Sequence, residues 1–159
     1  MAIGIFLFWE NPVKRRQLII ALGVGTIAFL LINELFCKHI LIDVTGIRPR
    51  PYIAHAELIT PIGKQLVDSS FPSSHMAGTA LIMTLLIREL PLLRPVAILF
   101  TFLMAFSRMH NGMHYPTDVL AGTLLGIGYG LLGIWAGKKT YKLPLPNPPL
   151  KQGREHPSK

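Results

Sequence analysis

The stretch SRMHNGMHYPTDVLAG, residues 107–122, places an arginine, two histidines and an aspartate between two apolar runs. His114 and Asp118 are four residues apart, so a helix would put them on one face, where the carboxylate can hold the imidazole N–H and raise its basicity. A histidine oriented in this way can act as a nucleophile. Titratable groups are costly to bury, so their presence beside apolar segments indicates a functional site.

Two further polar clusters have residue types that suit an oxyanion. RPRP covers Arg48–Pro51, and arginine presents a fork of donors that matches phosphate oxygens. FPSSH covers Phe71–His75, and a helix that begins at Ser73 or Ser74 would add backbone N–H groups. His75 could then protonate a leaving oxygen. Each cluster alone fits an interfacial arginine pair, an ordinary serine cap or a hydrogen-bonded histidine, but together they indicate a phosphate site.

The elements that must position these clusters are apolar helices. Half of the 159 residues are apolar and only 15% are charged, which is typical of one domain in a lipid bilayer. Glycines 122, 126 and 130 form a four-residue repeat that permits close helix contact in lipid. We therefore expect an all-α integral membrane helical bundle of about four to six helices. Four apolar stretches predict its spans, at about 18–36, 74–90, 92–107 and 117–137.

The basic residues indicate how the chain crosses the membrane. If Lys14, Arg15 and Arg16 are cytoplasmic, eleven of the 16 Lys and Arg residues fall on the inner side, as the positive-inside rule requires. The loops 37–73 and 107–118 then share the outer face, so the three polar clusters can meet. This topology explains the net charge of +8 and removes the reason to expect a nucleic-acid partner.

The chain divides into three predicted parts. Residues 1–17 are expected to form an interfacial N-terminal segment that is retained, because their apolar residues precede the basic cluster, the reverse of a secretory signal. Residues 18–137 form the membrane core. Residues 138–159 are expected to be a basic, proline-rich cytoplasmic tail. The single cysteine, Cys37, has no internal partner for a disulfide.

These residues resemble the signature of the type 2 phosphatidic acid phosphatase family, the membrane relatives of vanadium haloperoxidases and bacterial acid phosphatases. The signature runs K-x6-RP, then PSGH, then SR-x5-H-x3-D. Its second part is met by Pro72, Ser73 and His75, with Ser74 in place of glycine. If this position needs a backbone dihedral angle that only glycine adopts freely, Ser74 would be strained there. The third part is met in full by Ser107, Arg108, His114 and Asp118.

The first part of the signature is altered. The lysine position falls on Asp43 when counted back from Arg50 and on Leu41 when counted back from Arg48, and the nearest lysine is Lys38. Either the extra residues bulge out, or Arg48 supplies the missing charge.

The resemblance implies double displacement through a phosphohistidine, without a metal or another cofactor. His114 would attack phosphorus, Asp118 would steady it, and His75 would serve as acid and then as base. A metal pair of His110 with His114 is disfavoured, because HNG predicts a turn that breaks the helical register. The three equatorial oxygens would be held by Arg50, Arg108, Ser73 and the Ser74 amide, with Lys38 or Arg48.

A site at the outer ends of spanning helices would meet a lipid headgroup, so we expect a lipid phosphate or pyrophosphate as substrate. The economy of the chain favours a bacterial inner-membrane enzyme with a periplasmic site, and its compact outer loops favour lipid A 1-phosphate. Undecaprenyl pyrophosphate and phosphatidylglycerophosphate are the alternatives, and no obligate protein partner is expected. A non-catalytic phospholipid-binding or transport protein is the alternative of another class, although a binder has no use for an oriented nucleophile.

Overall fold

The computed structural model describes residues 11–61 and 65–141, and within these ranges the chain is helical or irregular, without strands. The predicted all-α architecture is therefore confirmed. In chain order the elements are α2 (Pro12–Ala28), the π-helix η1 (Phe29–Ile40), α3 (Leu41–Thr45), α4 (Pro51–Ala54), α5 (Ser74–Glu89), the 3-10 turn η2 (Pro91–Leu93), α6 (Arg94–His110) and α7 (Pro116–Tyr141).

The first rod runs without a break from α2 through η1 into α3. It begins earlier than the predicted residue 18, because the Asn11 side chain accepts hydrogen bonds from the N–H groups of Val13 and Lys14, and Pro12 occupies the first helical position. It ends at Gly46, whose φ of +83° is open to glycine. Most of the predicted interfacial segment, residues 1–10, and the tail from residue 142 lie outside the described residues. Residues 138–141 of that tail continue α7.

Glycines on α7 bring the bundle together, as their spacing predicted. A Cβ atom at Gly122 would lie 2.5 Å from the Ser73 carbonyl oxygen, and Cβ atoms at Gly126 and Gly130 would lie 2.2 Å and 2.8 Å from the nearest atoms of α5. The same helix meets α2 through Gly133 and Gly137. Close backbone contact of this kind is the usual mode of helix association in lipid. It fixes the start of α7 beside the start of α5.

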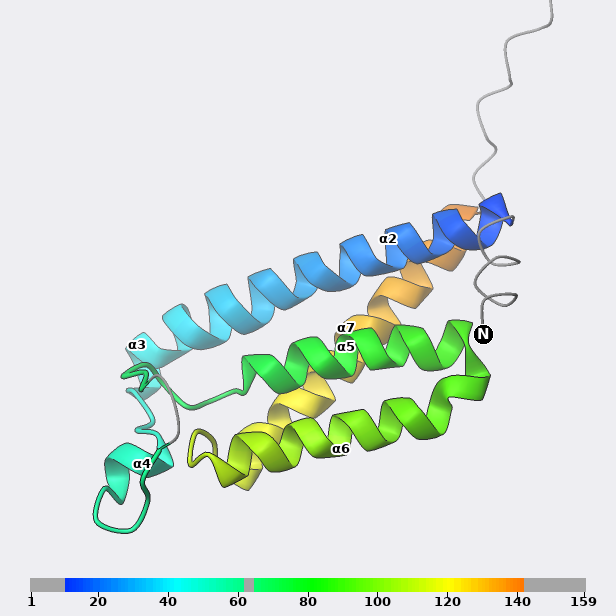
Figure 1. The fold of residues 1–159 in the computed structure, drawn as a ribbon. Coiled ribbons are helices and arrows are strands. Elements are labelled where there is room, and N and C mark those ends of the chain that lie inside the picture. Colours follow the sequence, from blue (N-terminus) through cyan, green and yellow to red (C-terminus); the bar gives the residue numbers. More distant parts are fainter. Residues whose placement is uncertain (1–10, 62–64, 142–159) are drawn as a thin grey trace, which may run out of the picture.

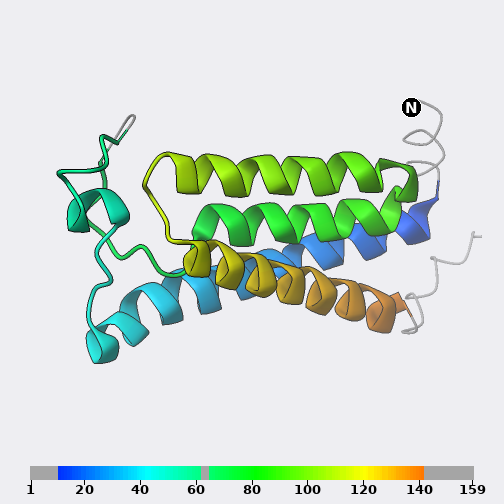
Figure 2. The ribbon, with the colours of Figure 1, turned by 90° about the horizontal axis from the view of Figure 1, so that it is seen from below.

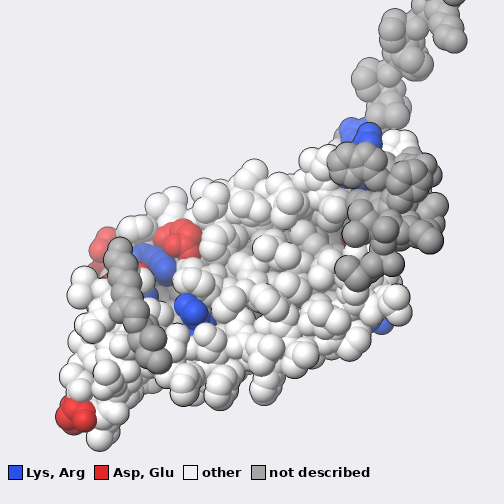
Figure 3. Space-filling model, viewed as in Figure 1, with Lys and Arg blue, Asp and Glu red and all other residues white. Residues whose placement is uncertain are grey.

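Among the described residues, three helical segments are long and apolar enough to cross a membrane: Pro12–Thr45, Pro91–His110 and Pro116–Thr140. The fourth predicted span, α5, has 16 residues. On the face in Figure 3 the charged atoms gather at the two ends of the bundle, and the middle is uncharged. The protein is therefore a helical membrane protein.

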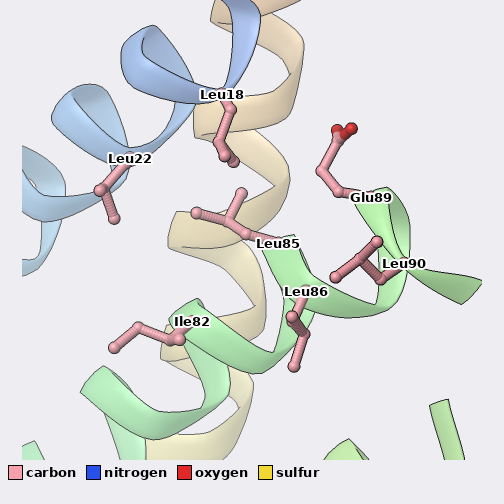
Figure 4. Close-up of a pocket in the computed structure, with 7 residues that line it drawn as sticks. All are labelled: Leu18, Leu22, Ile82, Leu85, Leu86, Glu89 and Leu90. Atoms are coloured by element: carbon pink, nitrogen blue, oxygen red, sulfur yellow. The ribbon is translucent and has the colours of Figure 1, made fainter. Parts of the chain in front are cut away.

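The two ends of the bundle differ in chemistry. Residues 46–61, residues 65–73 and the 111–115 turn lie together at one end, as Figures 1 and 2 show. At the other end, leucine side chains of α2 and α5 line an apolar pocket, with the Glu89 carboxylate at its edge (Figure 4). The polar clusters predicted to meet on one face are thus at one end of the bundle.

Candidate active site

His114 lies in the turn between α6 and α7, two residues before α7 begins. As predicted, the HNG sequence leads into a turn, and Gly112 has a φ of +64° in it. The imidazole is buried, and its Nδ1 lies 2.8 Å from the Ser70 carbonyl oxygen. A carbonyl oxygen only accepts hydrogen bonds, so Nδ1 carries the proton and the Nε2 lone pair is free. Nε2 is therefore the ring nitrogen with a lone pair available for a nucleophilic attack.

The surroundings of His114 keep the ring neutral. Burial lowers its pKa to about 4, and the positive charge of Arg50 adds to this effect. The Ser70 hydrogen bond and the Asp118 carboxylate oppose the lowering without cancelling it. An imidazole with this pKa is deprotonated at neutral pH, as a nucleophile must be.

Asp118 is fully buried and is the third residue of α7. Its Oδ2 accepts a hydrogen bond of 2.9 Å from the Tyr115 N–H, and Oδ1 accepts one of 2.6 Å from Arg48 Nη1. The Tyr115 bond caps the helix from its third position. Oδ2 lies 4.0 Å from His114 Nδ1. The direct partner of the imidazole N–H is thus the Ser70 carbonyl, and Asp118 acts on it as a nearby charge, because His114 precedes the helix rather than sitting on its first turn.

Two of the predicted phosphate ligands are engaged in ion pairs. Arg48 bonds to Asp118, donates to the Thr117 hydroxyl at 3.0 Å and lies over the Tyr115 ring at 4.4 Å. Arg50 is buried, donates to Asp68 Oδ1 at 2.7 Å and 3.1 Å, and donates to the Met113 carbonyl at 3.1 Å. These bonds hold the two loops together.

Arg108 differs from both. Among the described residues it has no carboxylate partner, and its contacts are the Ser107 hydroxyl at 3.4 Å and the Met113 sulfur at 4.0 Å. Its Nε is buried without a hydrogen-bond partner. A guanidinium with unused donors is suited to an incoming phosphate.

The start of α5 supplies the remaining predicted groups. Ser73 is the N-cap residue, its N–H donates to the Asp118 carbonyl at 3.2 Å, and its hydroxyl is buried without a partner. Ser74 needs no dihedral reserved for glycine, since no described non-glycine residue has a positive φ. The expected strain is therefore absent. His75, next along, is exposed and interacts electrostatically with Arg108, Lys38 and Arg50.

Most of the extra residues in the altered first motif are helical. The residues between Lys38 and Arg48 complete η1 and form α3, which ends before Gly46 with its positive φ. Lys38 lies 3.7 Å from Glu34 and within electrostatic reach of His75. Lys38 is thus beside the cluster, while Arg48 is bound to Asp118.

Sequence reasoning missed several residues of this cluster. Ser70 contributes a backbone carbonyl, which no side-chain pattern reveals; its own N–H donates to the Arg48 carbonyl at 3.0 Å. Asp68 gave no signal beyond its charge. Asn33 and Glu34 interrupt an apolar run, and polar residues within a span are a usable signal.

His110 stands apart from the cluster. It is the exposed last residue of α6, where it stacks on Phe106 with ring centroids 5.5 Å apart. Within residues 11–61 and 65–141, no group of three His, Cys, Asp or Glu side chains is placed to hold a metal ion.

Comparison with known proteins shows which family the chain belongs to. The profile of the PAP2 superfamily matches residues 18–142. Undecaprenyl-diphosphatase BcrC of Bacillus subtilis is 35% identical over 131 residues, which cover 82% of this chain and 62% of the relative. An undecaprenyl-diphosphatase of Sulfolobus acidocaldarius is 27% identical over 76% of this chain and 56% of its own length.

A third relative, decaprenylphosphoryl-5-phosphoribose phosphatase of Mycolicibacterium smegmatis, is 34% identical over 70% of this chain and 56% of its own length. The chain thus spans about three fifths of the length of the curated relatives it matches. No solved structure matches it. The profile covers most of the chain, and it includes all three polar clusters. The chain therefore belongs to the PAP2 superfamily, the type 2 phosphatidic acid phosphatase family that its motifs resemble.

Proposed function

We propose that this protein hydrolyses the terminal phosphate of a polyprenyl diphosphate, with undecaprenyl diphosphate as the first candidate, through a phosphohistidine on His114. The observation that carries the proposal is the neutral, buried His114, whose Nδ1 is held by Ser70 while Nε2 is free. The names of three relatives point to long polyprenyl lipids. They favour the undecaprenyl alternative over lipid A 1-phosphate, the substrate preferred from the sequence.

The reaction proceeds in two displacements. His114 Nε2 attacks the terminal phosphorus, the bond from phosphorus to the bridging oxygen breaks, and His75 gives a proton to the departing polyprenyl phosphate. A water molecule then attacks the phosphohistidine and passes a proton to His75. Inorganic phosphate leaves, and His114 returns to its neutral state.

Positive charge stabilises the transferred phosphoryl group. Arg108 offers unused donors, Lys38 adds a cation, and the first turn of α5 adds backbone N–H groups at Ser74 and beyond. Arg50 and Arg48 act mainly through the loops that they hold. We place this site on the periplasmic side of a bacterial inner membrane, because the basic residues at the other end of the bundle fit the cytoplasm.

The test is phosphate release by the purified protein in detergent with EDTA, from undecaprenyl diphosphate, lipid A 1-phosphate and phosphatidylglycerophosphate. Wild type is compared with His114→Gln and with the control His110→Gln, which changes the exposed histidine four residues earlier. We expect metal-free release from the diphosphate by wild type and control, and a rate at least about 10³-fold lower for His114→Gln.

Two other results would redirect the assignment. Preferential release from lipid A 1-phosphate would restore the first substrate reading while keeping the mechanism. Binding of lipid phosphates by all three proteins without release by any would favour a non-catalytic lipid-binding protein.

A further inference from the structure

Three polar residues lie where η1 passes the start of α5, inside a segment long and apolar enough to span the membrane. They are Asn33, Glu34 and Lys38. Ionisable groups inside a span are costly, so each one that persists indicates a function and a partner. The hydrolysis mechanism above uses Lys38 but leaves Asn33 and Glu34 without a role.

Their contacts connect η1 to the phosphate site. Asn33 is fully buried, and its Nδ2 donates to Glu34 Oε1 at 2.9 Å and to Ser74 Oγ at 3.1 Å. The Ser74 hydroxyl in turn donates to the Glu34 carboxylate, and Lys38 Nζ lies 3.7 Å from that carboxylate. Ser74 is the first residue of α5 and His75 the second. The Glu34 carboxylate thus meets both Lys38 and the helix start that carries the proposed acid.

The charges around His75 are unequal. It interacts with three cations, Arg108 from α6, Lys38 from η1 and Arg50 from the loop before α4, and with one carboxylate, Glu34. His114 is the other titratable group that faces it. Cations disfavour a protonated imidazole and a carboxylate favours it. A general acid has to hold its proton until the leaving oxygen takes it.

We propose that Glu34 is a positioning residue for phosphoryl transfer, which holds Lys38 and Ser74 beside His75 and supplies a negative charge that favours the protonated form of His75. Asn33 fixes the Glu34 carboxylate in this orientation. The proposal rests on the proposed function, since it assigns Glu34 a part in the same reaction.

The test is the pH dependence of phosphate release by Glu34→Gln, which keeps the size of the side chain and removes its charge. We expect kcat to fall about tenfold with KM changed less than about threefold, because the lost interaction favours the acid rather than substrate binding. The part of the profile in which activity falls with rising pH should move to lower pH, because His75 releases its proton more readily without the Glu34 carboxylate. The control, Glu89→Gln, removes a carboxylate at the opposite end of the bundle and should leave the profile unchanged.

A superimposable pH profile in Glu34→Gln would overturn the proposal, even if kcat fell, because it would leave only a structural role. If Glu34→Gln does not fold, Lys38→Met serves as the second test, and its pH profile should shift in the opposite direction. Loss of a cation beside His75 should move the falling part of the profile to higher pH, and an unmoved profile would overturn the proposal. Failure of the proposed function is separate, since wild type would then release no phosphate from any lipid.

Discussion

Acid titration of His114 gives a direct test of this buried histidine as the proposed nucleophile. Its pKa of about 4, against an ordinary value of 6.5, means that the folded protein favours the neutral ring by about 3 kcal/mol. At pH 7 only about one molecule in a thousand would carry the imidazolium, whereas an exposed histidine would be about one quarter protonated. The first displacement should therefore persist down to about pH 4, until Nε2 is protonated.

The same difference predicts a loss of stability in acid. The contribution is fully present above pH 6.5, where the ring is neutral in both the folded and the unfolded chain. It is lost as the pH falls from about 6.5 to about 4, because the unfolded chain binds the proton first. Below pH 4 both forms are protonated and the loss of about 3 kcal/mol is complete. His114→Gln should lack this part of the pH dependence.

The assay is NMR of the protein with ¹⁵N-labelled histidine in micelles, with the His114→Gln spectrum used to assign the signal. We expect a ring protonated at Nδ1, as the bond to the Ser70 carbonyl requires, and a titration midpoint near pH 4. A midpoint near 6.5 would show that water reaches the ring. A proton on Nε2 would refute the assignment of the nucleophilic atom.

Three further substitutions test the parts around the nucleophile. Arg108→Gln should lower kcat/KM by about 10²–10³, measured by steady-state phosphate release, because it removes the positive charge and the unpartnered Nε donor proposed to stabilise the transferred group. A loss under threefold would contradict this. Arg48→Met should lower the free energy of unfolding in a reversible detergent titration by about 2 kcal/mol, since Asp118 is fully buried while the Arg48 side chain is 40% exposed. Adding Asp118→Asn to Arg48→Met should recover part of the lost free energy of unfolding. If the effects of the two substitutions were simply additive, this would argue against an interaction between Arg48 and Asp118. Gly126→Leu should destabilise the bundle by about 1–3 kcal/mol, because its side chain would meet the α5 backbone, whereas the control Gly128→Leu enters open space. Equal effects of the two leucines would contradict close packing of α7 on α5.

The features of this protein that depend on local sequence pattern could be predicted from the sequence. The apolar runs predict the four long helical segments, and the glycine repeat predicts which face of α7 packs closely. The spacing of Arg108, His114 and Asp118 places them correctly at one end of the bundle, since a turn with Gly112 brings them together over few residues.

Contacts between distant segments could not be read in the same way. The Ser70 carbonyl is a backbone group, and any residue type at that position would offer it. The bond of Arg48 to Asp118 joins positions 70 residues apart, and the sequence left Arg48 free to bind phosphate instead. Glu34 was hidden for another reason: the prediction counted it as part of a span, whereas the structure places its carboxylate beside Lys38.

The shortness of α5 has a consequence for how the protein sits in lipid. Sixteen residues of α-helix reach about 24 Å, whereas the hydrocarbon core of a typical bilayer is about 30 Å thick. The helix that begins with Ser74 and His75 therefore cannot bring both of its ends to the two membrane surfaces at once. Either the bilayer thins around the site, or the phosphate group descends several ångströms below the plane of its neighbours' headgroups. For the proposed reaction, bilayer thickness should therefore affect the rate: a thinner membrane would bring the lipid phosphate closer to His114, and a thicker one would have to deform locally in each turnover.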